Sequence, residues 1–153
     1  METIDDTDRR ILNQLQRDCS LTNQELAARV HVSAPTCLRR VRRLVQLGVI
    51  ERQIAIVSAQ ALPSGLTAII EVTLERQGAE GLEEFERRLV EVPAVQQCYR
   101  VSAGPDFILI VYVADMPAYH AFAHEVLSSH ANVRNVRSFF STQRTKFAPA
   151  ISV

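Results

Sequence analysis

The chain has 153 residues, of which 47% are hydrophobic and 22% charged; this composition is typical of a folded globular protein and excludes a disordered one. No run approaches the roughly 18 apolar residues of a membrane span, and the acidic start METIDDTDRR is unlike a secretory signal. The three cysteines lie far apart and form no CxxC pair. This pattern argues against a disulfide framework or a zinc ribbon and favours the reducing cytoplasm.

The net charge of zero hides an uneven distribution of charge along the chain. Residues 29–52 hold six arginines and a single acid, Glu51, whereas residues 71–91 hold seven glutamates and three arginines. A basic first third and a more acidic remainder predict two modules with different partners. We place these modules at residues 1–52 and 67–153, with a connecting segment at 53–66.

Three helices are predicted in the first module. The first spans residues 5–17, and the second begins at a capping box made by Thr22 and Glu25. The third runs from an N-cap at Ser33 to about Leu47, before Gly48. A helix, a short turn and a longer arginine-rich helix form the helix-turn-helix layout. The first N-cap is Asp5 or Asp6, and the inward residues of the first two helices are Ile11, Leu12, Leu15, Leu26, Ala27 and Val30.

The third helix separates into an apolar face and a basic face at helical spacing. An apolar face backed by arginines is what a reader of the DNA major groove needs, although an ordinary solvated helix also carries charge on its outer face. Four arginines within five residues, with no acid among them, favour DNA binding. The inward residues are Cys37, Leu38, Val41, Leu44 and Val45, and the outward ones are Thr36, Arg39, Arg43 and Gln46, with Arg40 and Arg42 on the flanks.

The remainder of the chain predicts a hinge followed by alternating strands and helices. Residues 53–57 favour a short strand, and residues 58–66, with Pro63 and Gly65, favour a linker. The order that follows is βαββαβ, which gives an antiparallel four-stranded sheet with two helices on one face. Strands are expected at 67–76, 95–102, 107–113 and 133–140, and helices at 79–91 and from the N-cap Asp115 onward. Ala68, Ile70, Val72 and Leu74 should share one face of the first strand, and Leu82, Phe85 and Leu89 the inner face of the first helix.

No arrangement of residues indicates catalysis or a metal centre. His120 and His124 are four residues apart, as metal ligands on a helix can be, but HAFAH lacks the glutamate of a metalloprotease motif. Surface histidines are the favoured interpretation, and Cys37 is expected to pack in the core. A Ser/His/Asp triad, a P-loop and a GxGxxG turn are all missing from the sequence. We therefore expect neither enzyme activity nor a cofactor.

Taken together, these motifs resemble the Lrp/AsnC family of leucine-responsive, feast/famine regulators over about residues 4–147. The match is carried by the order of many short motifs, each of which is weak alone. They are the segments 5–18, 21–27, 32–44 and 48–50 in the first module, and Val101-Ser102, Asp106-Phe107, residues 115–119 and Thr145-Lys146 in the second.

The resemblance implies an α+β architecture, with an N-terminal three-helix domain of the winged helix-turn-helix type and a C-terminal ferredoxin-like βαββαβ domain. It also implies dimers that pair through their sheets, often assembled into octamers, and an amino-acid effector bound between C-terminal domains. A sheet with only one helix-covered face has a second face to bury, and we expect Val111 and its neighbours at that interface. Two recognition helices would then meet a pseudo-palindromic site in double-stranded DNA.

The implied effector site lies near the turn after the second strand. Asp106 is expected to accept hydrogen bonds from the ammonium group, unless it serves as a turn residue that bonds its own backbone. The family usually has glycine where Ala103 stands, and Gly-Tyr after Ile50 where this chain has Arg52-Gln53. The expected effector-binding residues are Ala103, Gly104, Asp106, Met116, Ser141 and Thr142.

The function expected from the sequence is that of a cytoplasmic, nucleoid-associated regulator of amino-acid metabolism genes, with no membrane partner. Two alternatives remain: an architectural DNA-binding protein without an effector, and a metabolite sensor that acts through protein partners. Thr36, Arg39, Arg40 and Arg43 should approach the major groove, and Ser33 and Arg42 the DNA backbone. The complete set of expected DNA-binding residues is Ser33, Pro35, Thr36, Arg39, Arg40, Arg42 and Arg43.

Overall fold

The computed structural model describes residues 4–58, 61 and 65–153, which divide into two compact units. The first unit contains Met1–Val57 together with Lys146–Val153, and the second contains Ser58–Thr145. Residues 146–153, expected in the second module, thus group with the first. Within the predicted linker, residues 59, 60 and 62–64, which include Pro63, lie outside the described residues. No helix in the described ranges is long and apolar enough to cross a membrane.

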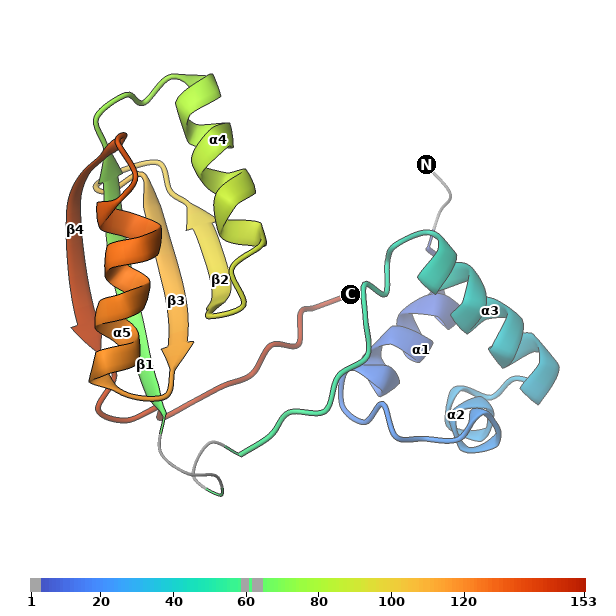
Figure 1. Ribbon diagram of the computed structural model, residues 1–153. Helices are drawn as coiled ribbons and strands as arrows, with labels where there is room; N and C mark the ends of the chain where they lie inside the picture. The colour runs from blue at the N-terminus through green and yellow to red at the C-terminus, as the bar shows by residue number, and fades with distance from the viewer. Residues whose placement is uncertain (1–3, 59–60, 62–64) are drawn as a thin grey trace. The chain divides into compact units, whose positions relative to one another are not determined.

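The first unit is built on the three predicted helices, α1 (Asp6–Leu15), α2 (Asn23–Val30) and α3 (Ala34–Gln46) (Figure 1). Asp5 and Asp8 form a capping box at the start of α1, and Thr22 and Glu25 form the predicted one at the start of α2. These caps satisfy main-chain N–H groups that a helix leaves unpaired at its start. The core consists of Ile11, Leu12, Leu26, Ala27, Val30, Cys37 and Leu44.

The inward face of α3 is narrower than predicted. Cys37 and Leu44 are fully buried, but Leu38 is 39% exposed and Val45 is 50% exposed. The prediction that these two residues pack inside is therefore wrong. Two short helices cover one stripe of α3, so residues at the edge of its apolar face remain in contact with solvent.

Residues 53–57, all of them described, form no strand, so the predicted hinge strand is also wrong. Ile54, Ile56 and Val57 are each more than half exposed. A strand needs a neighbouring strand to receive its main-chain hydrogen bonds, and the alternation of apolar residues alone does not supply one.

The second unit has the predicted βαββαβ order. Its sheet has the strand order β2-β3-β1-β4, with β1 (Leu66–Leu74) antiparallel to both β3 (Phe107–Val113) and β4 (Val133–Phe140), and β2 (Val95–Arg100) antiparallel to β3. The helices α4 (Ala79–Val90) and α5 (Met116–Phe122) cover one face of the sheet (Figure 1). A π-helical turn, η2 (Ala123–Ser128), continues α5.

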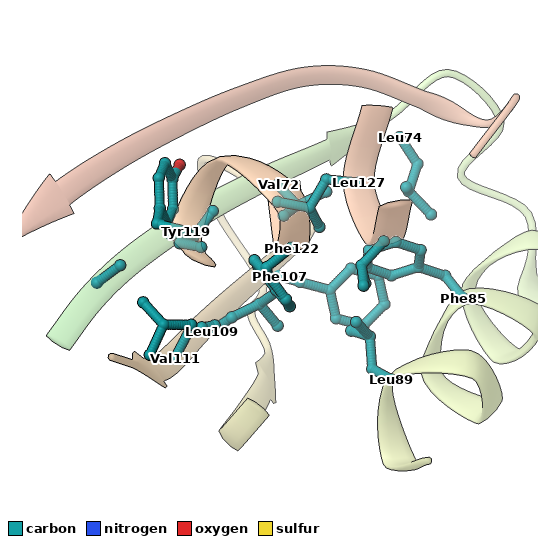
Figure 2. Close-up of a cluster of buried hydrophobic side chains, with 14 residues drawn as sticks. Val72, Leu74, Phe85, Leu89, Phe107, Leu109, Val111, Tyr119, Phe122 and Leu127 are labelled. Carbon is teal, nitrogen blue, oxygen red and sulfur yellow. The ribbon is translucent and has the colours of Figure 1, made fainter. Parts of the chain in front are cut away.

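The core of the second unit lies between the sheet and its helices, as Figure 2 shows. The four β1 residues predicted to share a face are all buried there. Val111 is also fully buried in this core, together with Phe107 and Leu109. The prediction that Val111 lies at an interface is therefore wrong, because β3 turns its odd-numbered residues toward the helices. Ile108, Ile110 and Tyr112 occupy the opposite face of β3.

Candidate functional site

The turn between α2 and α3 sets the direction of the third helix. His31 ends α2 in the left-handed conformation, with φ 58°, and Val32 N–H donates to the Ala27 carbonyl at 3.0 Å. The Asn23 side-chain amide donates to the Ala34 carbonyl at 2.8 Å, which ties the start of α2 to the start of α3. These contacts fix the angle between the two helices of the helix-turn-helix.

The predicted DNA-binding residues lie on α3 and at its N-cap. Ser33, Pro35, Arg39 and Arg42 are exposed. Thr36, Arg40 and Arg43 are half-buried. Ser33 occupies the N-cap position, but its hydroxyl donates to Thr36 Oγ1 at 2.9 Å and does not cap the helix. The described outer face of α3 therefore presents hydroxyl groups near its N-terminal end and guanidinium groups along its length.

Two of the arginines on α3 are held by carboxylates from α1. Arg40 Nη1 lies 2.7 Å from Asp5 Oδ2 and 2.9 Å from Asp8 Oδ1, and Arg43 Nη1 lies 3.1 Å from Asp8 Oδ2. The N–H of Asp8 and the Arg40 guanidinium hold the pKa of the Asp5 carboxyl below its usual value. Asp5 was predicted only as a candidate N-cap of α1, and no local sequence pattern links Asp5 or Asp8 with α3.

The second candidate site surrounds the turn from β2 to β3. Gly104 is exposed and has a φ of 85°, in the region that favours glycine. Asp106 Oδ2 accepts hydrogen bonds from Leu74 N–H at 2.7 Å and from Gln77 Nε2 at 3.2 Å. One oxygen of this carboxylate is thus already bonded to the end of β1 and to the segment after it. These bonds match neither of the two predicted roles, a contact with the ligand or a bond to the backbone of its own turn.

The remaining predicted effector residues lie at the other end of the sheet. The strand register pairs Val72 with Phe107, next to Asp106, and pairs Ala68 with Phe140, next to Ser141. Ser141 N–H donates to the Thr67 carbonyl at 2.9 Å, and Met116 follows β3 at this same end. The structure therefore does not bring Met116, Ser141 and Thr142 together with the turn at 103–106 inside one chain.

The described histidines and cysteines form no metal centre: in residues 4–58, 61 and 65–153 no three His, Cys, Asp or Glu side chains gather in a suitable arrangement. His120 and His124 are both exposed, as predicted. Cys37 is buried in the first core, also as predicted, and burial raises the pKa of its thiol.

A helix-turn-helix with a basic third helix, joined to a βαββαβ domain, defines a two-domain regulator of the DNA-binding class. Residues 4–51 match the family model "Winged helix-turn-helix DNA-binding", and residues 67–151 match "Lrp/AsnC ligand binding domain". The leucine-responsive regulatory protein of Rhizobium meliloti is 37% identical over 150 residues, which cover 98% of this chain and 96% of that protein. That of Escherichia coli K12 is 34% identical over 143 residues, covering 94% and 87%.

Solved structures agree with the sequence comparisons. A transcriptional regulator from Neisseria meningitidis, NMB0573 in complex with L-Met, has a TM-score of 0.85 and 32% identity, and the match covers 97% of this chain and 96% of that one. The feast or famine regulatory protein Rv3291c from M. tuberculosis, complexed with L-methionine, has a TM-score of 0.85 and 27% identity, covering 99% and 100%. The chain belongs to the Lrp/AsnC family of transcription regulators, as its sequence motifs indicated.

Proposed function

We propose that the protein binds an operator in double-stranded DNA through the outer face of α3 and that an amino acid bound to the second unit modulates this binding. The observation that carries the proposal is the charge of α3, a helix with four arginines and no acid at the recognition position of a helix-turn-helix, on which Arg39 and Arg42 are exposed. In this arrangement Thr36 and Arg39 reach base edges, and Ser33, Pro35 and Arg42 lie along the backbone. A DNA partner also implies a location at the nucleoid.

Selection from a random pool of duplexes tests the DNA-binding role. The wild-type protein should enrich a pseudo-palindromic sequence, because a two-fold symmetric dimer presents two recognition helices. Arg39→Ala should then weaken binding to that sequence by about 1–3 kcal/mol and relax the preference at one position. The matched control is Arg17→Ala, which removes an exposed arginine in the turn after α1. If Arg39→Ala keeps the DNA sequence preference of the wild type, Arg39 does not contact the bases.

The amino-acid effector is supported by the methionine complexes of the two structural relatives named above. In this chain the exposed turn at Ala103 and Gly104 offers main-chain groups to a ligand, while Asp106 shapes the turn through Leu74. Since Met116, Ser141 and Thr142 lie at the opposite end of the sheet, a site that uses both sets of residues must be shared between two copies of the chain.

Thermal unfolding in the presence of each of the twenty amino acids tests the effector. A ligand that binds the folded state should stabilise it by about 2.7 kcal/mol at a hundredfold excess over its dissociation constant. We expect methionine or another apolar amino acid to raise the melting temperature. One oxygen of the Asp106 carboxylate is already bonded, which favours one competing function, an architectural DNA-binding protein without an effector. The absence of a shift with all twenty amino acids would support that function.

The open face of the sheet supports the proposal of a homodimer. Ile69, Tyr99 and Phe139 are 38%, 53% and 46% exposed on this face, and Ile108 and Ile110 lie between them. An apolar sheet surface of this kind is stabilised when a second copy covers it. Assembly of dimers into octamers is a prediction from the family resemblance. Sedimentation of the wild type and of Phe139→Arg over a range of protein concentrations tests the dimer. The variant should be monomeric at concentrations at which the wild type is still a dimer.

A further inference from the structure

The carboxyl group of Asp8 is a buried charge that neither the DNA-reading face nor the effector site accounts for. Its side chain has no exposed surface, yet it lies in the first turn of α1, where a cap would normally be solvated. Both oxygens are used: Oδ1 accepts from Arg40 Nη1 at 2.9 Å, and Oδ2 accepts from Arg43 Nη1 at 3.1 Å. A buried carboxylate persists in a fold when it is paired in this way, so the pairing fixes both guanidinium groups against α1.

The same carboxylates border a hollow beside α3. Asp5, Arg39, Arg40 and Arg43 line a cavity of about 280 Å³. The Nε of Arg40 is buried and, among the described residues, has no hydrogen-bond acceptor. A buried donor without an acceptor is unfavourable, so the Arg40 guanidinium keeps hydrogen-bonding capacity that Asp5 and Asp8 do not use.

The charges around the hollow select the class of ligand. Among the described residues, the hollow is surrounded by three arginines and two carboxylates, Asp5 and Asp8, so guanidinium groups outnumber carboxylates there. A DNA phosphodiester carries one negative charge and two oxygens that match guanidinium groups in shape and charge. The hollow lies along the helix that our proposed function places on DNA.

We propose that this hollow binds one phosphate of the DNA backbone and that Asp8 is the positioning residue that holds Arg40 and Arg43 ready for it. The inference rests on the proposed function and changes the assignment of two residues: Arg40 and Arg43 contact the backbone, and base reading falls to Arg39 and Thr36. Arginines already held in place lose less conformational freedom when they bind a phosphate than arginines that move freely in solvent.

The proposal predicts an effect opposite in sign to simple Coulomb attraction. Asp8→Asn removes a negative charge from the DNA-binding side, which by charge alone should tighten binding to DNA. If Asp8 positions the arginines, the same substitution should weaken binding, since Arg40 and Arg43 lose their anchor. Asp6→Asn is the matched control: Asp6 lies in the same turn of α1, is exposed, and on removal changes the net charge equally.

The experiment is a fluorescence-anisotropy titration of the full-length protein with a labelled 30-bp duplex of mixed sequence, repeated over a range of KCl concentrations. We expect Asp8→Asn to bind about tenfold more weakly than wild type, with a slope of log K against log salt that is shallower by about 0.9, the value of one lost phosphate contact. Asp6→Asn should bind as tightly as wild type or slightly more tightly. Equal or tighter binding by Asp8→Asn, with an unchanged slope, would overturn the proposal.

Circular dichroism shows whether Asp8→Asn is folded at the assay temperature. If it is not, a second variant tests the same contact. Arg40→Gln leaves Asp8 paired with Arg43 and should lower the salt slope by about the same amount. Arg17→Gln removes one positive charge elsewhere on the first unit and should leave the slope unchanged. A wild-type slope for Arg40→Gln refutes the phosphate contact while leaving DNA binding in place, whereas a wild-type protein that binds no duplex at any salt concentration refutes the proposed function itself.

Discussion

The two units are stabilised by different kinds of interaction. The second unit has a continuous apolar core between a sheet and two helices, with Phe85, Phe107 and Leu109 fully buried. The first unit has a core half that size and adds a polar cluster in which a buried carboxylate joins two helices. Apolar packing tolerates few changes of volume, whereas a polar cluster depends on charge and geometry. The second unit should therefore be sensitive to changes of side-chain volume, and the first unit to changes of charge as well.

The largest expected effect is on the apolar core of the second unit. Phe85 is fully buried and lies 5.1 Å from Phe107 and 5.4 Å from His130, measured between ring centroids. Phe85→Ala should lower the free energy of unfolding by about 3–5 kcal/mol, since it removes the ring and leaves a cavity. Urea denaturation followed by circular dichroism measures this loss. A loss of unfolding free energy below about 1 kcal/mol would show that apolar packing around Phe85 does not stabilise the second unit as described.

Removal of residues 146–153 should affect the first unit instead. Gln16 makes two hydrogen bonds with the main chain of Ile151, at 3.0 and 2.8 Å, and Val153 packs on the first core. Each hydrogen bond contributes about 0.5–1.5 kcal/mol, so the truncated protein should lose about 1–3 kcal/mol. Hydrogen exchange should report the loss at α1 and leave β1 protected. Gln16→Ala in the full-length chain is the control, and equal exchange at α1 in all three proteins would contradict the assignment.

A stabilising change is expected at the turn of the helix-turn-helix. His31 adopts a φ of 58°, a left-handed conformation that is uncommon for any residue with a Cβ atom. His31→Gly should raise the free energy of unfolding by about 0.5–1 kcal/mol, because glycine meets no steric penalty there. The measurement is the melting temperature of the first unit. His31→Ala, which keeps the strain, should give no gain; a gain from both variants would assign the effect to the imidazole.

The smallest expected effect is a loss of folding stability at low pH, which should be confined to the first unit. The pKa of Asp5 lies below its ordinary value of 3.8, first through the N–H of Asp8 and then through Arg40. A carboxyl whose pKa is lower in the folded state stabilises the fold above the unfolded value, and that stabilisation is lost as the pH falls through the folded value. The first unit should thus unfold more readily between pH 4 and the folded pKa, and Asp5→Asn should flatten this slope. An identical slope in the variant would exclude Asp5 as its origin.

The sequence predicted those parts of the fold that depend on local patterns. The capping box at Thr22 and Glu25, the buried face of β1 and the limits of β3 all follow from residues close together in the chain, and all are confirmed. The face of β3 that meets the helices was assigned incorrectly at Val111, because an almost uniformly apolar strand has no alternation to distinguish its two faces.

The candidate sites were predictable in part, for a related reason. The DNA-binding face of α3 follows from helical spacing, but the pairing of Asp8 with Arg40 joins residues 32 positions apart, which no local pattern shows. The bond from Leu74 to Asp106 likewise depends on how strands pair in the sheet. Leu38 and Val45 were placed inside because helical spacing gives the direction of a side chain, while the size of the neighbouring helices decides how much of it is covered.

The return of residues 146–153 to the first unit has a consequence for how the protein is made. Its DNA-binding domain is discontinuous in sequence: residues 4–57 leave the ribosome first, and the segment that packs on α1 follows after the whole of residues 58–145. At about 5–20 residues per second, this delay lasts roughly 4–18 seconds. During that time α1 lacks the main-chain partner of Gln16. The three helices of a nascent chain are therefore made well before the segment that completes their domain.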